Sequence, residues 1–249
     1  MTTSLTRAQN LSATIESIAQ LTELYETYAD DLRIVRKEQR QLRDDRPDMK
    51  RQLDDIEAEI TYLRLRDRRP DHVVEIGCLH GWSTSWILRA LRDNGSGTLH
   101  SYDLVEHARD RVPAGLADGR WQFVAGDVRQ HTELLPDTVD YLFIDAAHTA
   151  PFARWYLSKL VAALPAGTPV SVHDVFHQAW PLPYSEPRTV LSWLRRHRTG
   201  FVTAARACRI SALPTLQRIR HDLGLTEPVH TGDHNPMIFF TTAQSDGPR

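Results

Sequence analysis

The amino-acid sequence predicts an α/β protein whose doubly wound, mostly parallel sheet of seven strands follows an N-terminal helical extension. Beyond Pro70, short apolar runs that end in glycine or aspartate alternate with helical patterns, as in chains built from β-α-β units. Before Pro70 the chain holds no glycine and a single proline, Pro47, and is dense in charged residues and helix formers. We therefore divide the chain into a helical extension at 1–68, an α/β domain at 69–242 and a flexible tail at 243–249.

The extension is predicted to form two amphipathic helices. From Ile15 to Val35 the apolar residues recur at steps of three and four, which places them on one helix face. A break is expected at 44–47, because proline is tolerated only near a helix start. The spacing does not sustain the clean heptads of a long coiled coil. We expect the pair to cap the main domain or to join subunits of a homo-oligomer, a dimer or larger. The apolar face of the second helix is expected to hold Met49, Leu53, Ile56, Ile60 and Leu63.

Seven short apolar runs supply the strands of the predicted sheet. In an open parallel sheet, ligands bind beyond the carboxyl ends of the strands, so the residues directly after each strand are the candidates for function. The predicted strands are 72–76, 98–102, 121–124, 141–144, 169–172, 201–204 and 237–241, with helices at 83–91, 151–163 and 189–198.

A turn with two glycines follows the first strand, in the pattern Glu75-x-Gly77-x-x-x-Gly81-x-Ser83-Thr84. Gly77 allows a tight turn, and Gly81 lets a ligand approach the backbone before a helix opens at Ser83 or Thr84. A dinucleotide site instead needs the spacing G-x-G-x-x-G. An acid at Glu75 suits a ligand with ammonium and sulfonium charges better than an anionic pyrophosphate. The turn therefore disfavours an NAD enzyme.

Acidic residues also follow the second and third strands. Asp103 ends the second strand, where a carboxylate can accept hydrogen bonds from both ribose hydroxyls. Gly126 and Asp127 follow the third strand, which places a carboxylate within reach of an adenine amino group. A single acid after a strand is usually a cap or turn residue. Acids after three successive strands, together with the glycine turn, indicate a nucleoside-binding site.

These motifs, with Phe143-Ile144-Asp145 after the fourth strand, resemble the class I S-adenosylmethionine-dependent methyltransferases. The similarity is to the metal-assisted O-methyltransferases, both catechol-type enzymes and, more closely, bacterial natural-product and sugar O-methyltransferases. It spans residues 71 to about 242 and implies a Rossmann-like methyltransferase fold. The cofactor-binding residues implied are Glu75, Gly77, Gly81, Ser83, Asp103, Gly126, Asp127 and Asp145.

The acceptor-side motif consists of Asp145-x-x-His148 after the fourth strand and His173-Asp174 after the fifth. By the resemblance, Asp145 and Asp174 would bind a divalent metal, Mg²⁺ or Mn²⁺, with His173 beside them. His148 would be the general base, with Asp145 next to it in the catalytic set. His173 stands where the family usually has an acid, and an imidazole suits Zn²⁺, Fe²⁺ or Mn²⁺ better than Mg²⁺. A metal-free alternative keeps His148 as the base and uses Asp145 to hold the ammonium group of the cofactor.

The loop from Phe176 to Pro187 is predicted to build the acceptor pocket. Its side chains His177, Trp180 and Tyr184 would bind substrate, with the aromatic rings stacking on an aryl group or a sugar face. The alternative is a proline-stiffened crossover that only leads to the helix at 189–198.

Composition limits the partners of the protein. Its 249 residues include 32 acidic and 30 basic ones, a net charge of −2 that argues against nucleic-acid binding. No apolar run approaches the ~18 residues of a membrane span, and the first residues do not resemble a secretory signal. Cys78 and Cys208 are the only cysteines, which is typical of a reducing cytoplasm.

We expect the protein to transfer a methyl group to a hydroxyl of a small molecule (a natural product, sugar or aromatic) by direct displacement. Two alternatives stay open. One is a cyclase or rearrangement enzyme that binds S-adenosylmethionine, and the other is a non-catalytic assembly subunit that uses the N-terminal helices as its interface.

Overall fold

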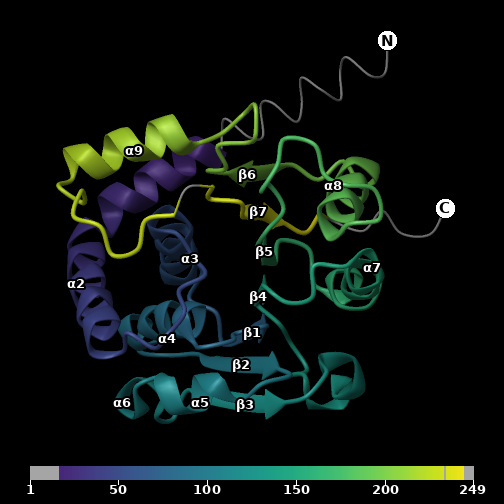
Figure 1. The fold of residues 1–249 in the computed structure, drawn as a ribbon, viewed down its shortest axis with the longest axis horizontal. Helices are drawn as coiled ribbons and strands as arrows, with labels where there is room; N and C mark the ends of the chain where they lie inside the picture. The colour runs from purple at the N-terminus through teal and green to yellow at the C-terminus, as the bar shows by residue number, and fades with distance from the viewer. Residues whose placement is uncertain (1–16, 233, 244–249) are drawn as a thin grey trace.

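A seven-stranded sheet with helices on both faces forms the centre of the molecule (Figure 1). The computed structural model describes residues 17–232 and 234–243. Ile15 and the predicted tail beyond Ala243 lie outside the described residues. The strand order is β3-β2-β1-β4-β5-β7-β6, and the predicted fold class is confirmed.

Five of the strands pair in parallel, and the last two form an antiparallel hairpin at one side of the sheet. The antiparallel pairing arises because β7 inserts between β5 and β6 after the chain has returned through α9. The parallel strands are β1 (His72–Ile76), β2 (Thr98–Asp103), β3 (Trp121–Ala125), β4 (Tyr141–Ile144) and β5 (Pro169–Val172); the others are β6 (Phe201–Thr203) and β7 (Ile238–Thr241).

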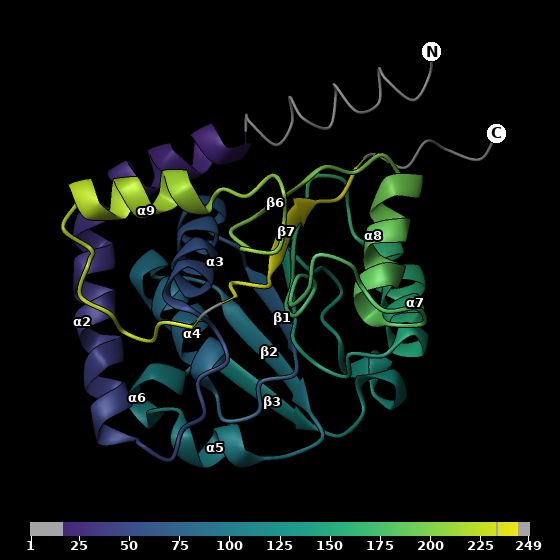
Figure 2. The same ribbon diagram turned by 45° about the horizontal axis from the view of Figure 1, so that its top comes forward.

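The helices form two layers of unequal depth (Figures 1 and 2). One face of the sheet carries α3 (Asp55–Arg68) and α4 (Trp82–Asn94), with α2 (Ala29–Asp45) and α9 (Leu213–Asp222) outside them. The opposite face carries α7 (Ala150–Lys159) and α8 (Glu186–Arg196). Short helices α5 (His107–Arg111) and α6 (Ala114–Ala117) connect β2 to β3, and 3-10 turns occupy Val128–Gln130, Thr132–Leu134 and Val161–Ala163. No helix in the described part of the chain is long and apolar enough to cross a membrane.

The N-terminal helices differ in detail from the predicted pair. Residues 17–27 are helical, and a turn at Tyr28 precedes α2, so the predicted first helix bends there (Figure 1). The second helix begins at Asp55 and not near Met49, because Glu57 accepts a hydrogen bond from the backbone of Asp54 in a capping box. Met49 and Leu53 are buried as expected, but they precede the helix.

A continuous hydrophobic core joins the N-terminal helices to the sheet. It includes Tyr25 and Ile60 from the helices, Trp86 from α4 and Phe239 from β7. A second core lies under α7 and α8 on the opposite face. The packing therefore has no break at the predicted domain boundary, because α3 is buried between α4 and the remaining N-terminal helices.

Candidate active site

The carboxyl ends of the five parallel strands gather at one edge of the sheet, where the sequence motifs lie. Gly77 and Gly81 both have positive φ, +83° and +84°, in the turn between β1 and α4. A Cβ at Gly77 would lie 1.9 Å from the backbone oxygen of Asp145, so only glycine allows this turn to pass against the end of β4. The turn thereby brings the first and fourth strand ends together.

Glu75 is fully buried and accepts hydrogen bonds from three hydroxyls. These come from Ser83 at 2.6 Å, Thr84 at 2.8 Å and Ser101 at 2.6 Å. Burial raises the pKa of Glu75 to about 7, although the three hydroxyls oppose the shift. Its contacts in this structure are internal, so Glu75 and Ser83 fasten the start of α4 to β1 and β2.

Glu75→Gln is expected to change how stability depends on pH. The pKa of Glu75 rises from 4.5 to about 7 on folding, so the folded state binds the proton more tightly. The stability that this group contributes is present below pH 4.5 and is lost as the pH rises through 7, by about 3 kcal/mol. Chemical denaturation at pH 4.5 and 7.5 should therefore show that the free energy of unfolding of the glutamine variant, relative to the wild type, is higher at pH 7.5 than at pH 4.5. If the difference in free energy of unfolding between the two proteins does not vary with pH, the raised pKa of Glu75 is contradicted.

Asp103 and Asp127 are both engaged by protein groups. Asp103 Oδ2 accepts hydrogen bonds from the backbone of Cys78 and Leu79, both at 2.7 Å, which ties β2 to the glycine turn. Arg129 donates to Asp127 and lowers the pKa of that carboxyl. Gly126 has φ +131°, and a Cβ there would lie 2.6 Å from the ring of His131. The predicted nucleoside contacts thus surround the strand ends, and Asp103 is the one that directly shapes the turn.

On the acceptor side, Asp145, His148 and Asp174 come together. His148 Nε2 lies 3.1 Å from an oxygen of Asp174 and 3.9 Å from one of Asp145. The potential metal-binding atoms of the three residues all lie within 4.8 Å of one another. Asp174 has a positive φ of 58°, a conformation that aspartate tolerates better than most residues and that often occurs at functional sites. The meeting of the fourth and fifth strand ends is as the sequence predicts.

His173 lies beside both aspartates of the cluster. It is buried, with Nδ1 3.2 Å from Asp145 and 3.0 Å from Asp174, and Nε2 3.4 Å from Glu57. Neither ring nitrogen has hydrogen-bond geometry to these oxygens. Burial lowers the pKa of His173, but Asp145 and Glu57 more than offset it and hold the pKa well above its ordinary value. The raised pKa favours the charged ring among the surrounding carboxylates. The role of His173 as a metal ligand stays a prediction, and His148 joins Asp145 and Asp174 as a further possible ligand.

Two residues outside the predicted site complete the surroundings of His148. Glu186, at the start of α8, is buried and lies 2.9 Å from His148 Nδ1, and it accepts a 2.7 Å hydrogen bond from the Tyr156 hydroxyl. The Glu186 hydrogen bond raises the pKa of His148, and burial opposes it. The apolar pattern predicts that this helix begins at Thr189, which leaves Glu186 in a loop, whereas α8 begins at Glu186. The missed signal is Ser185 before Glu186-Pro187, a helix N-cap followed by an acid and a proline.

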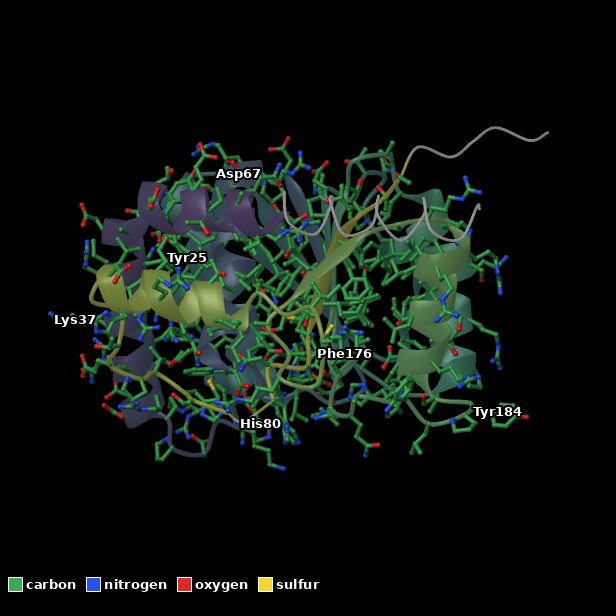
Figure 3. The ribbon with its side chains drawn as sticks, turned by 90° about the horizontal axis from the view of Figure 1, so that it is seen from above. Tyr25, Lys37, Asp67, His80, Phe176 and Tyr184 are labelled. Atoms are coloured by element: carbon green, nitrogen blue, oxygen red, sulfur yellow. The ribbon has the colours of Figure 1, made fainter. Side chains whose placement is uncertain are left out.

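The three side chains expected to bind the acceptor are divided. His177 Nε2 lies 2.5 Å from Asp174, within the cluster. Trp180 and Tyr184 are 85% and 90% exposed, so their rings lie open to solvent, and Tyr184 lines a groove between α7 and α8. Figure 3 places Tyr184 at the outer end of the molecule, beyond α8.

Comparisons with known proteins identify the class. Residues 74–175 match a family model described as a methyltransferase domain. Three solved structures share the fold. A proposed O-methyltransferase from Klebsiella pneumoniae has 18% identity and a TM-score of 0.57, and the match covers 84% of this chain and 90% of that one. An O-methyltransferase from Bacillus cereus in complex with SAH has 14% identity and a TM-score of 0.58, with 90% of this chain and 99% of that one covered. TomG from Streptomyces achromogenes, an O-methyltransferase of tomaymycin synthesis in complex with SAM, has 16% identity and a TM-score of 0.55, with 84% of this chain and 89% of that one covered. A sequence search of curated proteins gives no match.

The family match shows a methyltransferase domain, and the fold is the one that these solved structures share. The matched segment runs from β1 to the residue after Asp174, so it includes both the glycine turn and the acceptor-side cluster. Residues 74–175 therefore form a methyltransferase domain, and the prediction of a methyltransferase is confirmed.

Proposed function

We propose that this enzyme methylates a hydroxyl group of a small molecule (a natural product, a sugar or an aromatic compound), with His148 as the general base. The observation that carries the proposal is the contact between His148 Nδ1 and the buried carboxylate of Glu186. It leaves Nε2 toward Asp174 and Asp145 at the strand ends, where ligands of this fold bind.

The residues around His148 supply the proton chemistry. In the tautomer whose Nδ1–H donates to Glu186, the lone pair that can take a hydroxyl proton lies on Nε2. Tyr156 donates to the second oxygen of Glu186 and holds that carboxylate in place. S-Adenosylmethionine would supply an already activated methyl group on its sulfonium. The protein then has to align the acceptor and remove its proton, and a general base typically contributes about 10²–10⁴-fold.

A divalent metal fits the same cluster. Two aspartates and an imidazole offer donor atoms within 4.8 Å of one another, a set of oxygen and nitrogen ligands that divalent ions accept. Asp145 and Asp174 would hold the ion. It would supply a Lewis acid that lowers the pKa of an acceptor hydroxyl. His148 Nε2 cannot serve as ligand and base at the same moment, so the two roles call for separate tests.

Metal binding is expected to depend on Asp174. Titration of Mn²⁺ into chelator-treated protein, followed by electron paramagnetic resonance, should reveal one bound ion per chain. Asp174→Ala should weaken that binding at least tenfold, and Asp127→Ala, which removes an acid outside the cluster, should not. Chelator should lower methyl transfer in parallel. Absence of Mn²⁺ binding together with chelator-insensitive turnover would leave acid–base catalysis without a metal, with Asp145 free to hold the cofactor ammonium.

Asp103 tests the cofactor half of the proposal. Asp103→Ala is expected to weaken binding of S-adenosylmethionine by about 1.5–3 kcal/mol, because a charged hydrogen-bond acceptor is lost. Isothermal titration calorimetry measures this directly. Asp103→Asn is the matched control, since it keeps an oxygen for the Cys78 and Leu79 amides while it removes the charge. Wild-type protein that binds no S-adenosylmethionine would exclude the proposed function, and unchanged affinity in both variants would remove Asp103 from the site.

A further inference from the structure

Residues of α7 and α8 line a groove. These two helices lie on the face of the sheet opposite the N-terminal helices (Figure 1). The volume of the groove is about 1570 Å³, and its apolar lining includes Leu157, Val161 and Trp193. Its lining includes Ala150 and Tyr184, each two residues along the chain from a member of the His148–Glu186 pair.

Four arginines line this groove: Arg154, Arg188, Arg196 and Arg198. All four are exposed, and none of their guanidinium groups has a hydrogen-bond or ion-pair partner among residues 17–232 and 234–243. No aspartate or glutamate lines the groove. The positive charge is local, because the whole chain has a net charge of −2.

Arginines of three helices on the opposite face behave differently. Every arginine of α2, α3 and α4 has a side-chain partner, as in the pairs Arg66–Asp31 and Arg92–Glu38, or the contact of Arg68 with a backbone carbonyl. The four arginines of the groove lack such partners and lie together on α7, on α8 and just after α8. Like charges in one groove repel each other, and an anionic partner would remove that repulsion.

We propose that the α7–α8 groove binds an acidic amphipathic helix of a partner protein. Its volume exceeds the roughly 300–1000 Å³ of small-molecule pockets. The apolar lining between two helices fits the apolar face of a third, and the arginines fit acidic residues on that helix's flanks. Nucleic acid fits less well, because the chain lacks the overall basic excess that phosphate binding calls for. The proposal does not depend on the reaction at His148.

The test uses the full-length protein and a fluorescently labelled 20-residue helical peptide with leucine on one face and glutamate on the flanks. A second peptide with lysine in place of glutamate is the probe control. The groove variant is R188E/R196E. The matched control is R209E/R218E, which reverses two exposed and unpaired arginines outside the groove. Circular dichroism melts establish that both variants fold. We expect fluorescence anisotropy to give saturable binding of the acidic peptide that weakens with salt and falls at least tenfold in the groove variant only.

Several results would overturn the proposal. No saturable binding of the acidic peptide, equal binding of the lysine peptide, or equal weakening in both variants would each reject the groove as its site. Loss of binding to anionic phospholipid vesicles in R188E/R196E, with peptide binding unchanged, would make the occupant a membrane surface. Light scattering that shows a wild-type dimer dissociated by R188E/R196E would make it a second copy of the chain.

Discussion

His148→Ala is expected to lower turnover by about 10²-fold or more while leaving the affinity for S-adenosylmethionine nearly unchanged. The reason is that the imidazole acts on the acceptor hydroxyl at the ends of β4 and β5, whereas the cofactor motifs lie at β1, β2 and β3. Steady-state kinetics and calorimetry measure the two quantities separately. Full activity of His148→Ala would reject the base assignment, and His173 would be the next candidate.

Glu186 provides the matched variant for this experiment. The Glu186 hydrogen bond raises the pKa of His148, and a base works only after it has lost its proton. Activity of the wild type should therefore rise with pH above the ordinary histidine pKa of about 6.5. In Glu186→Gln the rising part of the profile should move to lower pH, and kcat should fall because the tautomer is less well held. A merely structural role of Glu186 would lower activity without moving the profile.

The second large effect concerns folding, and we expect Glu59→Ala to lower the free energy of unfolding by about 3–5 kcal/mol. Glu59 is completely buried, accepts a 2.8 Å hydrogen bond from the Tyr25 hydroxyl and pairs with Arg36 and Arg220. Its removal leaves the buried Arg36 guanidinium without its carboxylate, inside the core that joins the N-terminal helices to α9. Equilibrium urea denaturation gives the difference.

Glu227→Ala is the control for this measurement. Glu227 pairs with Arg40 at 3.1 Å but is 72% exposed, so its loss should cost less than about 1 kcal/mol. Equal effects of the two substitutions would mean that the buried network does not hold the N-terminal helices in place. The more conservative Glu59→Gln keeps an acceptor for Tyr25. Its loss in free energy of unfolding should lie between those of Glu59→Ala and Glu227→Ala.

Much of the sheet could be predicted because strand signals are local. The apolar run 141–144, for example, is short and bounded by polar residues. It has the same bounds as β4, Tyr141–Ile144, in the structure. The meeting of Asp145, His148 and Asp174 was also predictable, since adjacent parallel strands end at one edge. Helix starts were less predictable. The capping box at Asp54 and the cap at Ser185 set them, and apolar periodicity alone does not reveal either.

The sequence by itself determined the order of the strands and helices, the glycine turn and the class of enzyme, because each depends on residues close together in the chain. Tertiary structure alone decided which side chains meet across long separations. Glu186 reaches His148 from 38 residues away, and Glu57 of the N-terminal region faces His173 across the core. Such pairs have no local signature, because they depend on how the layers pack. The same packing buries the apolar face of the N-terminal helices within one chain and leaves the arginines of α7 and α8 without partners.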